Sequence, residues 1–268
     1  TDFSRSTSTA SDWSYWNNTN HNSFVELNQK LTGGWEAQGS VLRLESDSDS
    51  ELFYQYGTPD PATGEGLLAY PSQYDLNVEQ WVVDAHANGP FELAGRTHEL
   101  VLGATWSRSE TVDESRYGQG IGDPMPPLNE WDGNHARPAF DAGVGGSDWT
   151  DRGTATYAAA RWSLTNQLTA ITGLRMTWLD NEGESYGATK ESSYDAVKTP
   201  YAGLIFDVND DHSVYASYTE IFQPQTEVDI NRSRLDPIDG VNYELGLKSE
   251  FNDDRIQTTV ALFQAEQK

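Results

Sequence analysis

The chain has 268 residues, no cysteine and a formal net charge of −25, from 17 basic and 42 acidic residues. This composition excludes disulfide frameworks and thiolate metal sites, and it argues against a nucleic-acid surface, which needs clustered Lys and Arg. Hydrophobic residues make up 36% and aromatic residues 12%, with 13 Tyr and 23 Gly, which favours a β protein over a disordered chain. No apolar run approaches the ~18 residues of a transmembrane helix.

Apolar and polar residues alternate through most of the chain, which predicts β-strands, because a strand points successive side chains to opposite faces. The alternation is clearest near the end, where Glu244 and Lys248 share one side and Leu245 and Leu247 share the other. We expect ten strands, in chain order over residues 13–31, 35–56, 73–88, 97–111, 149–164, 168–183, 194–208, 212–222, 241–251 and 255–267.

Short and long connections alternate between these strands. The short ones are rich in Asn, Asp and Gly, which tolerate turn dihedrals, and they fall at 32–34, 89–96, 165–167, 209–211 and 252–254. The long ones fall at 57–72, 112–148, 184–193 and 223–240. Short turns at one end and long loops at the other are typical of outer-membrane β-barrels. The apolar side of each strand would then face lipid and the polar side a hydrated lumen.

Four segments make the chain recognisable: "SVYASYTEIFQPQ" at 213–225, "LDPIDGVNYELGLKSEF" at 235–251, "RIQTTVALFQAEQ" at 255–267 and the hairpin at 157–179. They resemble the barrel of TonB-dependent ferric-siderophore receptors, nearest to the hydroxamate or pyoverdine-type subgroup. Before residue 149 the likeness is limited to the spacing of strands and loops, without diagnostic motifs. The resemblance implies an all-β, antiparallel transmembrane barrel of twenty-two strands, of which about ten lie in this chain. Residues 1–268 would form part of the barrel domain, without the N-terminal plug and the last strands.

The resemblance also implies a function. A receptor of this kind binds a ferric siderophore from outside and imports it with energy that the TonB–ExbB–ExbD complex supplies through the plug. The expected location is the outer membrane of a Gram-negative bacterium, among lipid and lipopolysaccharide, with no nucleic-acid partner. We expect no catalytic residues and no cofactor, because the ferric iron arrives inside the ligand.

Aromatic side chains on the long-loop side are the candidates for ligand contact, because Trp and Tyr combine a large contact area with a polar tip. Trp131 and Trp149 rank first, since they bracket the longest loop. The alternative is that these rings form a membrane-interface girdle or pack loops together. The six candidates are Tyr70, Tyr74, Tyr117, Trp131, Trp149 and Tyr186.

Four charged residues, Arg161, Arg175, Glu244 and Lys248, are expected to point into the lumen. The favoured interpretation is a structural lattice of ion pairs across adjacent strands, each worth about 0.2–1 kcal/mol. The alternative is a polar path that contacts the plug or a passing ligand.

Alternating acids in "ESDSDSE" at 45–51 suggest a divalent-cation site, but this segment lacks the glycine and distant Glu of an EF-hand loop. A solvated rim is the favoured interpretation, and no metal site is expected. No HExxH or G-x-S-x-G motif occurs.

Two other classes stay open. One is an outer-membrane barrel enzyme, such as a protease or phospholipase, which would need an acid–His or Ser–His pairing at the strand tops. The other is a secreted β-sandwich that binds carbohydrate, which would bury Met176, Leu245 and Leu247 between two sheets.

Overall fold

The computed structural model describes residues 8–143, 145–225, 230, 235, 237–251 and 255–267. The strands of these parts form one antiparallel sheet of eleven strands. Within the described residues, no helix has the length and apolarity of a membrane span. The elements are β1 (Tyr15–Lys30), the 3₁₀ turn η1 (Thr32–Gly34), β2 (Glu36–Tyr56), β3 (Leu68–Leu93), β4 (Arg96–Tyr117), β5 (Gly145–Ser163), β6 (Leu168–Ser185), β7 (Ala188–Thr189), β8 (Ser192–Asn209), β9 (His212–Gln223), β10 (Ile238–Phe251) and β11 (Ile256–Gln267).

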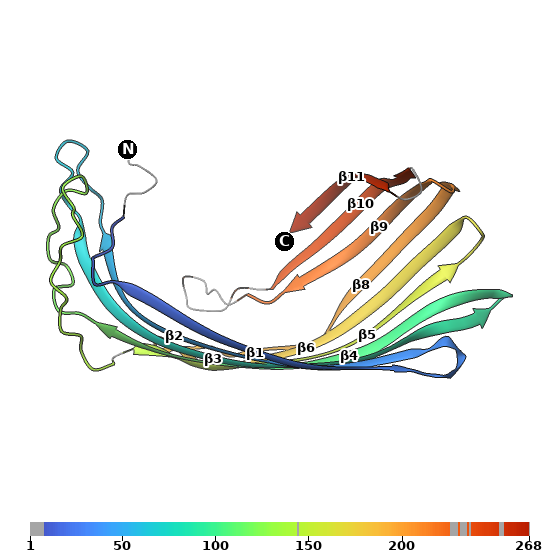
Figure 1. Ribbon diagram of the computed structural model, residues 1–268, viewed down its shortest axis with the longest axis horizontal. Coiled ribbons are helices and arrows are strands. Elements are labelled where there is room, and N and C mark those ends of the chain that lie inside the picture. The colour runs from blue at the N-terminus through green and yellow to red at the C-terminus, as the bar shows by residue number, and fades with distance from the viewer. Residues whose placement is uncertain are drawn as a thin grey trace.

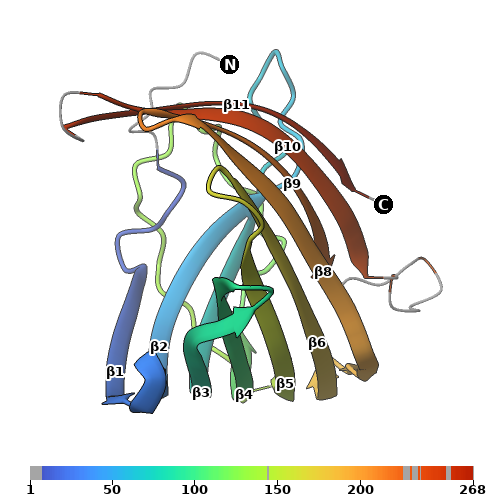
Figure 2. The same ribbon diagram turned by 90° about the vertical axis from the view of Figure 1, so that its right-hand side faces the viewer.

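The strands follow one another in chain order, so that each long strand pairs with the one before it. Figures 1 and 2 show them as a strongly curved wall, with β1 along one edge and β11 along the other. A second sheet that could bury the apolar side chains is absent from the described part of the chain. Leu245 is accordingly 54% exposed and Leu247 42% exposed. This arrangement excludes the β-sandwich and confirms the barrel-type fold.

The short connections lie at one end of the wall. The connection predicted at 89–96 is tighter than expected, because β3 continues through Pro90 to Leu93 and β4 begins at Arg96. Only Ala94 and Gly95 form the turn, and both have positive φ, 52° and 74°, as a two-residue hairpin turn requires. The turn predicted at 252–254 lies outside the described residues.

At the other end the strands are longer than the sequence predicted. Residues 57–72 were expected to be a loop, yet β3 already begins at Leu68. β4 likewise continues to Tyr117, past the predicted end at residue 111. The stretch 184–193 contains a small hairpin, in which the two-residue strand β7 folds back onto β6. The expectation of ten strands therefore holds for the long strands only.

One face of the wall is apolar along its lower half, toward the short turns. In the ladders that join adjacent strands, apolar residues face apolar residues: Ala158 lies opposite Leu102 and Leu174, and Leu245 opposite Ala216 and Leu262. In a membrane barrel the outward face carries an apolar band that contacts hydrocarbon. This band is therefore the expected lipid contact.

Aromatic rings border the band on both sides. The lower row consists of Trp35, Phe91, Trp162, Phe206 and Phe251, and the upper row of Trp81, Trp106, Trp178, Tyr218 and Tyr243. On β3, the rise from Phe91 to Trp81, at ~3.3 Å per residue and a tilt of ~40°, gives a height of ~25 Å, which matches the apolar band of a membrane barrel.

Candidate ligand site on the polar face

The register of the sheet assigns every side chain to one of two faces. The apolar face carries the lipid band, and the opposite, polar face therefore lines the inside of the wall. Tyr70, Tyr74 and Tyr117 lie on the polar face, and Trp149 is paired across the sheet with Thr111 of the same face. The Tyr186 ring contacts that face as well. The structure thus gathers five of the six predicted aromatic candidates at the long-loop end of one face.

Tyrosines of three adjacent strands form a continuous row there. The Tyr70 ring of β3 lies edge-on to Tyr56 of β2 and to Tyr117 of β4, with a centroid distance of 5.9 Å in both pairs. Burial, aided by the neighbouring Tyr70, raises the pKa of Tyr117, so that its hydroxyl stays a neutral donor. Tyr54 and Tyr56 stay 46% and 44% exposed. The row therefore offers several aromatic surfaces and hydroxyl groups to a molecule inside the wall.

Tyr186 extends the row from the β6–β7 turn. Its hydroxyl donates to Asp113 Oδ2 over 2.7 Å and lies 2.7 Å from Ser115 Oγ. Burial of the hydroxyl raises the pKa of Tyr186 to about 12; the hydrogen bond from Ser115 works against this rise, and the hydrogen bond to Asp113 adds to it. The turn is consequently held against β4 by a hydroxyl that stays protonated throughout the physiological range.

Trp149 of β5 lies beside the tyrosine row and contacts Lys190. The Lys190 ammonium lies over its ring, 3.7 Å from the centroid, and its indole N–H donates to Asp151 Oδ2 over 3.1 Å. A cation fixed on an aromatic face next to the tyrosine row suits an anionic or planar group on a ligand.

Trp131 lies on the other face. Its ring stacks on Phe53 at 5.4 Å, and its indole N–H donates to the Ala10 carbonyl over 3.2 Å. Phe53 and Met125 are 4% and 7% exposed, so this cluster is a small hydrophobic core between β2 and the segment that follows β4. The longest loop is thereby fixed to the apolar side of the wall, above the lipid band, and the position of Trp131 matches the loop-packing alternative.

The four charged residues predicted to face the lumen lie on the polar face, but they form no lattice. None of them belongs to an ion pair among the described residues. Arg175 lies over the Tyr157 ring at 6.0 Å, Lys248 lies over Tyr215 at 5.2 Å, and Glu244 accepts from the Tyr215 hydroxyl. The expected ion-pair lattice at these positions is wrong, because the residues beside Arg175 and Lys248 are Thr, Ser and Tyr rather than carboxylates.

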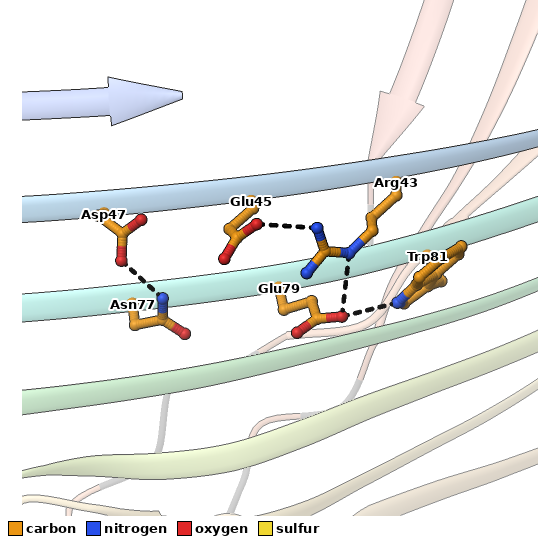
Figure 3. A network of polar contacts seen from close by, with 6 residues as sticks. All are labelled: Arg43, Glu45, Asp47, Asn77, Glu79 and Trp81. Atoms are coloured by element: carbon orange, nitrogen blue, oxygen red, sulfur yellow. Dashed lines mark hydrogen bonds and ion pairs between the residues drawn. The ribbon is translucent and has the colours of Figure 1, made fainter. Parts of the chain in front are cut away.

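The lattice is present on the opposite face, above the upper aromatic row (Figure 3). Arg43 donates to Glu45 over 2.8 Å and to Glu79 over 3.3 Å, and the Trp81 indole donates to Glu79 over 2.8 Å. Similar exposed pairs continue across the wall, for example Arg152 with Glu182 at 2.8 Å. Each is worth about 0–1 kcal/mol, so the lattice covers the outer surface more than it stabilises the fold.

The alternating acids of 45–51 lie on the same face as the lattice, but each has its own partner. Asp47 accepts from Asn77 over 2.8 Å and Asp49 from Asn17 over 3.3 Å. Glu51 accepts from the Arg137 guanidinium, and its side chain is 6% exposed, so a solvated rim is wrong for this residue. The described residues contain no group of three or more acidic or histidine side chains placed to hold a metal ion.

A polar cluster at mid-height of the polar face was missed by the sequence reasoning. The carboxylate of Asp84 accepts from Thr105 over 2.9 Å, lies 3.0 Å from His86 Nδ1, and is approached by the Tyr157 hydroxyl at 3.3 Å. These residues come from three strands. The only signal in the sequence is that the alternation of each strand places them on the polar face.

Neither acid–His nor Ser–His pairs occur at the strand tops of the described residues. The pair of Asp84 and His86 lies at mid-height. His212 Nδ1 lies 2.8 Å from Ser249 Oγ, but at the short-turn end and on the apolar face. The arrangement expected of an outer-membrane enzyme with a catalytic rim is therefore not found in the described part of the chain.

Known proteins resemble the chain over its whole length. It is 34% identical to a ferric-pyoverdine BN7/BN8 receptor of Pseudomonas putida, covering 100% of the chain and 34% of that receptor. It is 30% identical to the ferripyoverdine receptor of Pseudomonas aeruginosa, covering 98% of the chain and 32% of the receptor. The chain thus spans about a third of the length of these relatives.

Among solved structures, the ferripyoverdine receptor of the Pseudomonas aeruginosa outer membrane bound to ferripyoverdine superposes with a TM-score of 0.90 at 28% identity, covering 100% of the chain and 35% of the receptor. The ferric-catecholate import receptor Fiu of E. coli shares the fold alone, with a TM-score of 0.80 at 14% identity, covering 96% of the chain and 42% of that chain. The family described as TonB dependent receptor-like, beta-barrel matches residues 1–268, and the chain belongs to it.

Proposed function

We propose that this chain forms part of the wall of an outer-membrane receptor that binds a ferric siderophore of the pyoverdine class and imports it. The family membership and the names of the relatives support a receptor of this kind. The observation that carries the proposal is the row of tyrosines, with Trp149 and Lys190 beside it, at the outer end of the polar face.

The chemistry of this row fits a ferric chelate. Such a ligand is bulky and carries planar or apolar surfaces together with polar groups. Aromatic rings supply contact area, hydroxyl groups supply hydrogen bonds, and the Lys190 ammonium supplies a positive charge. The role is binding and transport rather than catalysis. Iron enters only as part of the ligand, and the energy comes from the TonB system through parts of the receptor outside these residues.

The proposal is tested with the full-length gene. A deletion strain should lose growth on at least one ferripyoverdine as the sole iron source and regain it from a plasmid copy. The purified full-length receptor should bind the same ferripyoverdine, measured by quenching of the receptor's tryptophan fluorescence. Unchanged growth on every ferric siderophore of a panel that spans hydroxamates, catecholates and pyoverdines would contradict the proposal.

A further inference from the structure

The small hairpin of β6 and β7 brings Lys190 to the polar face, beside the tyrosine row. Tyr186 and Gly187 form its turn, and both have positive φ, 49° and 74°, as a tight two-residue hairpin requires. The Tyr186 N–H donates to the Gly146 carbonyl of β5 over 2.7 Å, and the hydroxyl donates to Asp113 of β4. The hairpin is therefore bound to two neighbouring strands, which fixes the residues that follow it.

Gly183 determines where Lys190 lies. It is paired with Trp149 across the sheet and has a φ of 137°. A Cβ atom there would come within 2.2 Å of the Asp148 carbonyl oxygen and within 2.5 Å of Trp149 Cα, so only glycine allows β6 to approach β5 this closely. After β7 the chain returns to the same place, where the Lys190 N–H donates to the Gly183 carbonyl over 2.8 Å. The backbone of Lys190 is thus fixed next to the Trp149 ring.

The Lys190 ammonium covers one face of the Trp149 ring, at 3.7 Å from the centroid. A planar group of a ligand cannot stack on this face while the ammonium lies there. The indole N–H is also in use, because it donates to Asp151. On this side, what Trp149 presents to a ligand is therefore the cation that it holds rather than its own ring.

The charges around the pair favour an anion as the ligand group. Asp113 accepts a hydrogen bond from the Tyr186 hydroxyl. Asp151 accepts one from the Trp149 indole. Lys190 belongs to no ion pair among the described residues. Because a chain with a net charge of −25 repels anions over most of its surface, a cation at the contact point decides whether an anionic group is bound there.

We propose that Lys190 selects among ferric siderophores for those that carry a free carboxylate outside their iron-binding groups. This inference rests on the proposed function and names the chemical class that the site prefers. The carboxylate accepts a charge-assisted hydrogen bond from the ammonium while the rest of the chelate lies against the tyrosine row. A carboxamide at the same position of the ligand accepts only the weaker hydrogen bond of a neutral oxygen, so the neutral chelate is bound less tightly.

The test compares two forms of the ferripyoverdine that supports growth through the full-length receptor. One form has its free carboxylate, and the other has this group converted to the carboxamide while iron is bound. Quenching of the tryptophan fluorescence of the purified full-length receptor measures both Kd values. We expect the wild type to bind the carboxylate form about fivefold more tightly than the carboxamide form. Growth supported only by ferripyoverdines that lack a free carboxylate would overturn the proposal.

Variants of Lys190 separate its charge from its packing. Lys190→Met keeps an aliphatic chain over Trp149 and should reduce the ratio of the two Kd values to about one. Lys190→Glu should reverse the preference. Lys198→Met, the matched control on the lipid-side face of β8, should keep the wild-type ratio. Equal Kd values in the wild type, or an unchanged ratio in Lys190→Met, would overturn the inference and leave the proposed function intact. Binding of neither form would contradict the proposed function, and this inference with it.

Discussion

The guanidinium of Arg137 binds both carboxylate oxygens of Glu51, and so ties the long segment after β4 to the end of β2. The Glu51 side chain is 6% exposed, whereas Arg137 is 54% exposed, so the pair closes one side of the core around Phe53.

Arg137→Ala should therefore loosen this segment. The substitution leaves the buried carboxylate of Glu51 without its charged partner, which costs about 1–3 kcal/mol. Hydrogen exchange of residues 118–143 in the full-length receptor should become faster by the corresponding factor. Arg152→Ala, which removes an exposed pair with Glu182, should change local protection by less than about 1 kcal/mol. Equal effects of the two substitutions would show that the burial of Glu51 adds nothing to the strength of its ion pair with Arg137.

The adjacent alanines of β5 provide a test of the two faces. Ala158 lies on the apolar face between Leu102 and Leu174, and Ala159 lies on the polar face beside Gly173. Ala158→Arg should lower the free energy of unfolding by about 2–4 kcal/mol, because it puts a charge near the middle of the hydrocarbon. Ala159→Arg should cost clearly less. Urea titrations of the full-length receptor refolded into lipid vesicles measure the difference. A larger loss for Ala159→Arg than for Ala158→Arg would show that the two faces are wrongly assigned.

Tyr117 and Trp131 separate ligand contact from loop packing. Tyr117→Ala removes a ring from the row and should raise the Kd for the ferric siderophore about 5–30-fold, the equivalent of ~1–2 kcal/mol. Trp131→Ala should leave this Kd within about twofold, since its ring stacks on Phe53 on the other face, while hydrogen exchange of residues 118–143 becomes faster. A loss of affinity in Trp131→Ala alone would return this residue to the ligand site.

The raised pKa of Tyr186 predicts that the stability of the folded state changes at high pH. Its pKa in the folded protein is raised to about 12 from an ordinary value of 10.0, so the folded state keeps the proton that the unfolded state loses. The contribution to stability is complete below pH 10 and disappears as the pH rises toward 12. NMR of ring-labelled tyrosine should show a resonance that titrates near 12 and is missing in Tyr186→Phe. A midpoint near 10 would mean that the turn is open to solvent.

The alternation of side chains was sufficient to predict the faces. A strand has a fixed period of two, so the opposite placement of Glu244 and Leu245 follows from their order in the chain. Strand ends were predicted less well. Beyond the membrane band both faces of the sheet are polar, so the alternation of apolar and polar residues is lost around Tyr70 and Tyr117 although the strands continue.

Contacts between distant segments could not be predicted. The side of the wall on which Trp131 packs depends on Phe53, which lies far away in the chain. The partners of Arg175 and Lys248 depend on which side chains the register places beside them, and these are a Tyr ring and hydroxyl groups. The cluster around Asp84 likewise requires three strands to be in register.

The length of β3 determines how far the tyrosine row lies from the bilayer. At ~3.3 Å per residue and a tilt of ~40°, the distance along the strand from Trp81, at the bilayer surface, to Tyr70 corresponds to a height of ~28 Å. A ligand bound at the proposed site would therefore lie well clear of the acyl chains, level with the sugar coat of the cell. Changes in that coat should alter the rate at which ligands arrive without altering how tightly they are held.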